Sequence, residues 1–168
     1  MTYLTALDLL QSPGALELGQ VASDEHGATV DAVLMSLTIT AGDRTAYTAD
    51  EIARADAALV RIARLIADVG ELIDGYLVGR YPQPLNPVPG ILRAWATDIF
   101  RFRLHANLQD GDRSPVSVRY RDAIKSLGLV RDGKLSLGGA DPIATSSEGG
   151  VRISAPERVF THDTLADY

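Results

Sequence analysis

Residues 48–79 read TADEIARADAALVRIARLIADVGELIDGYLVG. In this stretch apolar side chains recur at alternating spacings of three and four residues, at Ile52, Ala55, Leu59, Ile62, Ile66, Val69, Ile73 and Tyr76. That period keeps them on one face of an α-helix. Thr48 and Glu51 have the spacing of a capping box, which marks the start of a helix. The pattern predicts one amphipathic helix over 49–79, about 45 Å long at 1.5 Å per residue, as the central element of a mainly α fold.

The residues that follow predict a connector and two further helices. Residues 81–89 contain four prolines, each of which restricts the preceding residue to extended geometry, so we expect a stiff, polyproline-like connector. Pro89 suits the first turn of a helix over 89–107, with an apolar stripe at Ile91, Leu92, Trp95, Ile99, Phe102 and Ala106. Ser114 and Pro115 suit the start of a helix over 115–131, which Gly133 would end, with core residues at Val118, Ile124, Leu127 and Val130.

The residues before the long helix predict shorter elements. Thr5 suits the cap of a first short helix, and Pro13 with Gly14 would interrupt it before a second over 15–21. Residues 30–37 are compatible with a helix. Residues 37–40 alternate between apolar and polar side chains with period two, which predicts a short strand or an extended loop.

Glycine, serine and proline dominate from Lys134 onward, so we divide the chain into a helical domain over 1–133 and an extended tail or arm over 134–168. The tail has too few large apolar residues to offset the backbone entropy of folding by itself. It still alternates with period two around Val151 and Ile153, and again at Val159 and Phe160. Such alternation suits a strand added to the edge of the same subunit or of a neighbour. The alternative is a tail that lies on its own helices.

The composition of the chain excludes several classes of function. The chain has 168 residues, a net charge of −6 and no cysteine, which excludes disulfide frameworks, thiolate metal sites and cysteine nucleophiles. No segment is long and apolar enough to cross a membrane, and no signal peptide is visible at the N-terminus, so we expect a soluble protein made in a cytoplasm. The acidic balance disfavours free-standing, high-affinity binding to nucleic acid.

No arrangement of residues predicts catalysis. The three histidines lie far apart in the sequence, at His26, His105 and His162, and neither a G-x-S-x-G turn nor a phosphate-binding glycine loop occurs. Asp68, Glu71 and Asp74 recur at spacings of three and could do acid–base work. Arg64 and Arg80 stand close enough to favour ordinary ion pairing instead. We therefore expect no enzyme, no cofactor and no metal.

The run IDGYLVGRYPQPL at residues 73–85 resembles the central signature of the Mu-like prophage head–tail adaptor (connector) family. Other stretches resemble the family in the same order: YLTALDL at 3–9, PGIL at 89–92, TDI at 97–99, VRYRDA at 118–123, GKLSLG at 133–138 and RVF at 158–160. The resemblance implies a small, helical connector-like subunit of the phage neck.

The resemblance also implies partners. Copies of the subunit would form a ring that joins the head portal to a tail or stopper protein, and DNA would pass through it without sequence-specific binding. The protein would occur in the host bacterial cytoplasm during assembly and then in the virion neck, with no membrane involved. The alternative is a small, helical, oligomeric DNA-packaging or DNA-binding regulatory protein.

The end of the long helix and the connector carry the candidate assembly residues. We expect them to fix the angle between the two longest helices: Asp74, Tyr76, Gly79, Arg80, Tyr81, Pro82 and Pro84. Arg80 would pair with Asp98 or Asp74. Gly75 and Gly79 would admit a close backbone neighbour, or Gly79 would form a left-handed helix cap. The alternative is an ordinary helix–loop–helix corner without a role in assembly.

Overall fold

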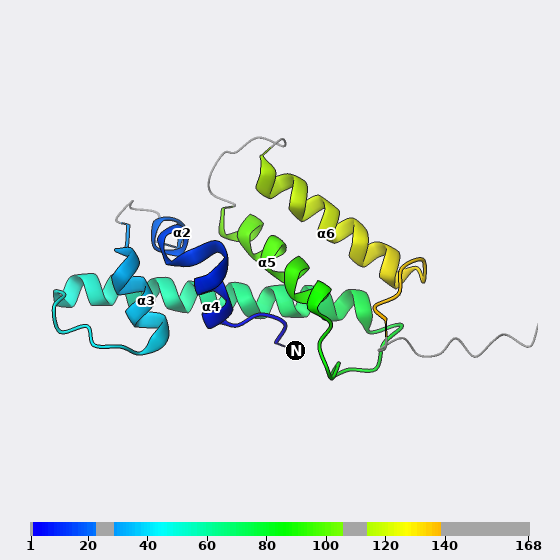
Figure 1. Cartoon of the computed structure of the whole chain (residues 1–168), viewed down its shortest axis with the longest axis horizontal. Coiled ribbons are helices and arrows are strands. Elements are labelled where there is room, and N and C mark those ends of the chain that lie inside the picture. The colour runs from blue at the N-terminus through cyan, green and yellow to red at the C-terminus, as the bar shows by residue number, and fades with distance from the viewer. Residues whose placement is uncertain (1, 23–28, 106–113, 139–168) are drawn as a thin grey trace, which may run out of the picture.

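The longest helix, α4 (Ala49–Leu77), runs the length of the molecule in the computed structural model, which describes residues 2–22, 29–105 and 114–138 (Figure 1). The predicted capping box is present, because the hydroxyl of Thr48 accepts from the Glu51 N–H and the Glu51 carboxylate accepts from the Thr48 N–H. The predicted apolar stripe is confirmed: Ala55, Ile62, Val69 and Ile73 are buried, and its other members are half-buried.

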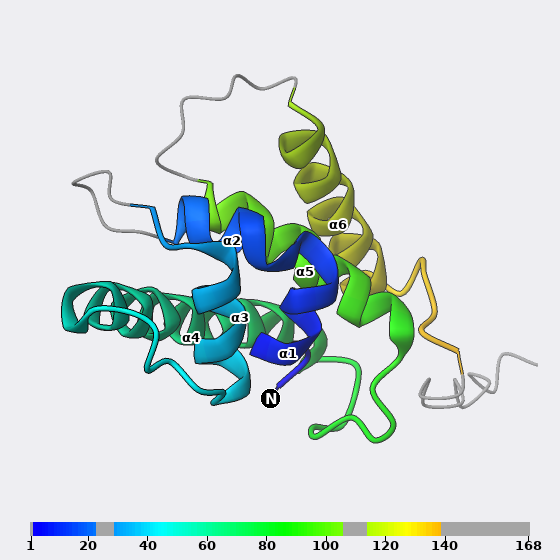
Figure 2. The ribbon, with the colours of Figure 1, turned by 60° about the vertical axis from the view of Figure 1, so that its left-hand side comes forward.

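Two helices pack against the C-terminal half of α4. These are α5 (Gly90–Leu104) and α6 (Pro115–Arg131), and α5 contacts both of the others (Figure 1). Figure 2 shows α6 on the far side of α5, diverging from α4 except near its C-terminal end. The cap predicted for α6 is confirmed, since the Ser114 hydroxyl accepts from the Ser117 N–H and Pro115 is the first helical residue.

The predicted core faces of α5 and α6 need correction at two positions. Ile91 and Val118 were expected in the core but are 48% and 41% exposed. Because α5 lies between two helices, its buried face is wider than one stripe and includes Leu92, Ala96, Ile99, Phe100 and Leu104. Phe102 is half-buried and stacks on Tyr120 of α6, with ring centroids 3.9 Å apart. Ala106 lies outside the described residues.

Three short helices precede α4: α1 (Ala6–Leu9), α2 (Ala15–Val21) and α3 (Ala32–Thr40) (Figure 2). Helices α1 and α3 contact α4, and α2 packs against α3. Thr5 caps α1, as predicted, and the chain turns away at Leu10–Gly14, where Ser12 is extended and Gly14 has φ +100°. The backbones of α2 and the segment before α3 nearly touch. A Cβ on Gly19 would lie 2.3 Å from the Val30 carbonyl oxygen, so only glycine fits there.

The strand or extended loop predicted at 37–40 is wrong, because α3 continues to Thr40. The hydroxyls of Thr38 and Thr40 donate to the carbonyls of Leu34 and Ser36, at 2.8 and 2.9 Å. These bonds one turn back let β-branched threonines fit a helix. Ala41, in the left-handed conformation, ends it.

The connector between α4 and α5 is bent rather than straight. The chain bends at residues 81, 83–84 and 86–87, so the expected straight, polyproline-like segment is not formed. Tyr81 and Leu85 are buried in the core. No strand occurs among the residues that the structure describes.

Candidate functional site: the corner between α4 and α6

The end of α4 is a tight turn that directs Tyr81 into the core. The N–H groups of Arg80 and Tyr81 both donate to the carbonyl of Leu77, each at 2.9 Å. Neither role expected of the glycines is found. Gly79 does not adopt a positive φ, and a Cβ added to Gly75 or Gly79 would meet no atom within 4 Å. Both glycines are exposed on the outside of the helix.

Arg80 reaches across to the C-terminal end of α6. Its Nη1 donates to the carbonyl oxygen of Val130 at 3.2 Å, and its guanidinium lies 5.7 Å from the centre of the Tyr81 ring. A cation there favours the negative end of the α6 dipole. Gly133 ends α6 with φ +76°, as predicted, and a Cβ on it would stand 2.7 Å from Nη1 of Arg80. We expected a carboxylate partner for Arg80; the contact that joins it to α6 is a backbone carbonyl.

Tyr81 fastens the beginning of the tail. Its side chain is 2% exposed, and its hydroxyl accepts from the N–H of Leu137 at 3.2 Å. Leu137 is itself buried and Leu135 packs against the same core. The described start of the segment 134–168 therefore belongs to the helical domain. The arm residues Val151, Ile153, Val159 and Phe160 lie outside the described residues.

Asp74 holds the N-terminal segment at the same corner. The hydroxyl of Tyr3 donates to the Asp74 carboxylate. Burial, and then the bond to Asp74, raise the pKa of Tyr3 well above its ordinary value, so it remains a donor. Tyr3 is 3% exposed, and half-buried Tyr76 lies beneath the Arg131 guanidinium, 5.9 Å from its ring centre.

Four of the seven predicted residues therefore meet partners at one corner: Asp74, Tyr76, Arg80 and Tyr81. Gly79, Pro82 and Pro84 are exposed on its outer surface. Sequence reasoning missed the remote partners, Tyr3, Val130, Gly133 and Leu137, as members of the site. Three of them, Tyr3, Gly133 and Leu137, lie in stretches 3–9 and 133–138, which carry the family resemblance. The resemblance therefore marked these residues, but it did not indicate that they contact the end of α4.

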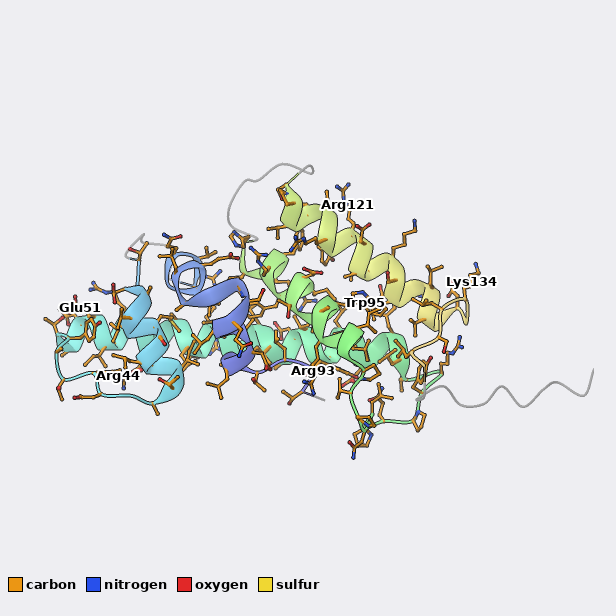
Figure 3. The ribbon with its side chains drawn as sticks, in the orientation of Figure 1. Arg44, Glu51, Arg93, Trp95, Arg121 and Lys134 are labelled. Carbon is orange, nitrogen blue, oxygen red and sulfur yellow. The ribbon has the colours of Figure 1, made fainter. Side chains whose placement is uncertain are left out.

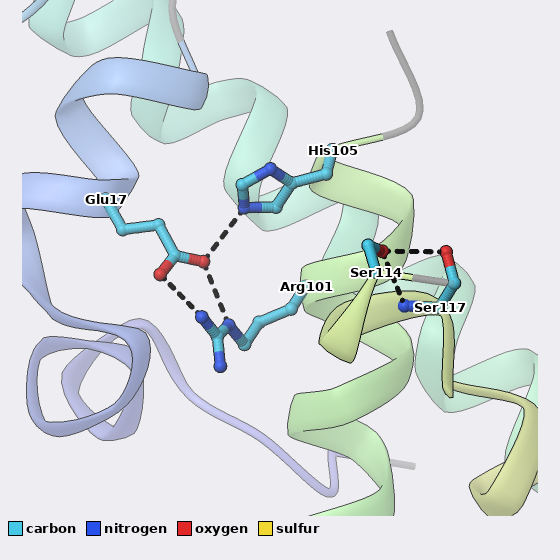
Figure 4. A network of polar contacts seen from close by, with 5 residues as sticks. All are labelled: Glu17, Arg101, His105, Ser114 and Ser117. Carbon is cyan, nitrogen blue, oxygen red and sulfur yellow. Dashed lines mark hydrogen bonds and ion pairs between the residues drawn. The ribbon is translucent and has the colours of Figure 1, made fainter. Parts of the chain in front are cut away.

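A second polar cluster joins α2 to α5 (Figure 4). Arg101 donates through Nε and Nη2 to the two carboxylate oxygens of Glu17, at 2.9 and 2.7 Å, and Nε2 of His105 lies 2.9 Å from Oε1. Burial opposes the ionisation of Glu17, but the bonds from Arg101 and His105 outweigh it and hold the pKa of Glu17 below its usual range. The cluster is an ion pair with a histidine attached, which suits it to holding two helices together. Sequence reasoning missed it.

Other chemical sites are sparse in the described part of the chain. Within 2–22, 29–105 and 114–138, no group of three His, Cys, Asp or Glu side chains could hold a metal ion. Among the same residues, no helix is long and apolar enough to span a membrane. His26 and His162 lie outside the described ranges.

Comparison with known proteins identifies the relatives of the chain. The model of the family described as "Bacteriophage Mu, Gp36" matches residues 3–155. "Gene product J" of Escherichia phage Mu is 33% identical over 98 residues, which cover 57% of this chain and 67% of that protein. The Mu-like prophage FluMu protein gp36 of Haemophilus influenzae is 33% identical over 107 residues, 62% of this chain and 72% of the relative. The chain, with its corner and the segments gathered there, belongs to the bacteriophage Mu Gp36 family.

Proposed function

We propose that the protein is a structural subunit of the phage or prophage neck. Copies form a ring that joins the head portal to the tail or a stopper protein and lets DNA pass without sequence-specific binding. The subunit acts as an adaptor, first in the host bacterial cytoplasm and then in the virion neck. Neither catalysis nor a cofactor is part of this role. Membership of a phage Mu family supports the phage context.

The observation that carries the proposal is the corner. Arg80 and Tyr81 join the end of α4 to the end of α6 and to the start of the tail. A ring closes only when each subunit presents its two contact surfaces at a fixed angle. A corner that fixes the relative orientation of the long helices supplies that angle. If the corner is instead an ordinary helix–loop–helix connection, the same contacts are present but assembly does not depend on them.

Deletion of the gene from an inducible prophage tests this role. We expect filled heads and separate tails to accumulate, and the gene supplied in trans to restore joined particles, as counted by electron microscopy. Joined particles at normal yield without the gene would contradict the proposal. Negative-stain images of the concentrated, purified protein would add the number of copies in the ring.

The DNA-binding alternative has one observation in its favour. Three basic side chains on α6 are exposed: Arg119, Arg121 and Lys125. Binding through phosphate contacts would weaken steeply with salt. If the purified protein shifts duplex DNA at about 150 mM salt and loses that shift at higher salt, the alternative is favoured; a neck subunit should leave the duplex unshifted.

A further inference from the structure

Two helix faces that lie outside the core have matching patterns. On α4 the outer face carries Arg64, Ala67, Glu71 and Gly75, and Val78, directly after the helix, continues its line; all five are exposed. On α6 the outer face carries Val118, Arg121, Lys125 and Leu129, and Asp132 continues its line; all are exposed except half-buried Leu129. Val78 is 72% exposed, the largest value among the exposed large apolar residues in the described part of the chain, and Val118 is 41% exposed. We call these the α4 outer face and the α6 outer face.

The two faces point away from each other. Ile62, Val69 and Ile73 turn the inner side of α4 toward the core, and Ala123 and Leu127 do the same for α6. With α5 between the two helices, their outer sides lie on opposite sides of the molecule (Figure 1). Figure 3 shows Arg121 on the side of α6 that faces away from α4. One copy therefore cannot bring both faces together, but two successive copies can.

The intervals between face residues are the same on both helices. From Val78 back to Arg64 and from Val118 on to Asp132 they are three, four, four and three, a series that reads the same in both directions and so does not choose an orientation. The charges do, because a parallel pair would set Arg64 opposite Val118 and Val78 opposite Asp132. The antiparallel register sets Val78 opposite Val118, and Ala67 opposite Leu129. It also sets Glu71 opposite Lys125, and Arg64 opposite Asp132. Both charged pairs have opposite signs.

We propose that the α4 outer face of one subunit docks on the α6 outer face of the next copy, in this antiparallel register. The inference rests on the proposed ring, because it supplies the contact between neighbours. The contact spans about 21 Å at 1.5 Å per residue. Joining two different faces on opposite sides of the subunit is a heterologous contact, which generates a ring when the rotation closes. The antiparallel register gives two pairs of opposite charges, whereas a parallel alignment or a shift by one turn keeps at most one, so the charges favour this register.

A second copy could also dock α4 against α4. An antiparallel pair of α4 outer faces would set Arg64 opposite Glu71 of the partner, and Val60 opposite Gly75. That contact joins two copies of the same face and produces a closed dimer, which leaves the α6 outer face without a role. The ring favours the heterologous contact, and charge-reversal variants separate the two.

The test uses the full-length protein in the deletion prophage. Glu71→Lys and Lys125→Glu each place like charges together, so each should lower the yield of joined particles at least tenfold. The double variant restores opposite charges and should return the yield to within threefold of the wild type. Thermal unfolding is the control for folding, because both side chains are exposed and neither change should move the midpoint by more than about 2 °C.

A cross-linking experiment gives a second readout. The chain has no cysteine, so Glu71→Cys with Lys125→Cys introduces the only thiols. Oxidation of assembled particles should give a ladder of covalent oligomers on a non-reducing gel. The matched control, Arg64→Cys with Glu71→Cys, should give no cross-link, whereas α4-to-α4 docking would link that control as a dimer.

The outcomes separate the two proposals. A Lys125→Glu variant that joins particles normally, or rescue of Glu71→Lys by Arg64→Glu in place of Lys125→Glu, would overturn the docking inference and leave the neck function standing. Joined particles formed without any copy of the gene would contradict the neck function itself.

Discussion

The two ends of α4 are held in different ways. At the N-terminal end, Thr48 and Glu51 bond to each other across three positions and at an exposed site. At the C-terminal end the partners are remote: Asp74 with Tyr3, Arg80 with Val130, and Tyr81 with Leu137, separated by 71, 50 and 56 positions. A local cap stabilises one helix. The remote contacts fix how several segments lie relative to one another, so changes there should affect geometry as well as stability.

The largest expected effect is at Tyr81. Tyr81→Ala removes a buried aromatic side chain and should lower the free energy of unfolding by about 3–5 kcal/mol. Tyr81→Phe keeps the ring and removes the hydroxyl that accepts from the Leu137 N–H, so it should cost about 1 kcal/mol. Urea denaturation of both variants measures the difference. Equal losses would mean that the ring contributes little at this end of α4.

Arg80 and Gly133 should show energetic coupling. Gly133→Ala places a Cβ in a left-handed conformation and against Arg80, and should cost about 2 kcal/mol. In an Arg80→Ala background the crowding is removed, so the same change should cost less, by about 0.5–1 kcal/mol. A double-mutant cycle by urea denaturation measures the coupling. Strict additivity would indicate that the two residues do not share one site.

The Glu17 cluster adds a dependence of stability on pH at a site between α2 and α5, and the lowered pKa of Glu51, caused by its bond to the Thr48 backbone, acts in the same direction at the N-terminal end of α4. The pKa of the Glu17 carboxyl is lower in the folded state than in the unfolded state. The ionised carboxylate therefore stabilises the fold fully above the unfolded pKa of about 4.3, and this stabilisation is lost as pH falls through the folded pKa. Glu17→Gln should cost about 1–1.5 kcal/mol at pH 7, where the carboxylate bonds Arg101 and His105.

The same variant should also lose less stability than the wild type between pH 5 and about pH 3. Unfolding midpoints of the two proteins across that range test the expectation. If the curves run parallel, the carboxylate of Glu17 is not the titrating group.

The smallest effect is expected at the local end of α4. Thr48→Ala removes the hydroxyl that accepts from the Glu51 N–H, and should cost about 0.5–1 kcal/mol. Thr48→Asp keeps a capping acceptor and serves as the control. If Thr48→Ala destabilises the protein as much as Tyr81→Ala, the contrast between the two ends is wrong.

Helix bounds were predictable where their signals are local. Thr48 with Glu51, Ser114 with Pro115, and Gly133 mark helix ends through residues a few positions apart, and the structure has them in those roles. The local pattern gave a wrong prediction at 37–40, where apolar and polar residues alternate as they do in a strand. The segment is helical because the hydroxyls of Thr38 and Thr40 donate to backbone carbonyls one turn earlier.

The candidate site was only partly predictable for the same reason. The sequence identified Arg80 and Tyr81 as members of a corner, but periodicity does not indicate which remote carbonyl or N–H a side chain will meet. Glu17, Arg101 and His105 were missed because 84 positions separate the first two, and each alone resembles an ordinary surface residue. A left-handed cap was one of the two roles that glycine as a residue type suggested for Gly79, whereas the turn at Leu77 needs no positive φ there.

If the corner sets the geometry that assembly requires, changes at the two ends of α4 should differ in their effect on assembly. The yield of joined particles is compared when the deletion prophage is complemented by Arg80→Ala or by Thr48→Ala, two variants from opposite ends of α4, each confirmed to be folded. We expect a yield lowered several-fold or more for Arg80→Ala and near that of the wild type for Thr48→Ala. Equal yields for the two variants would contradict this role of the corner.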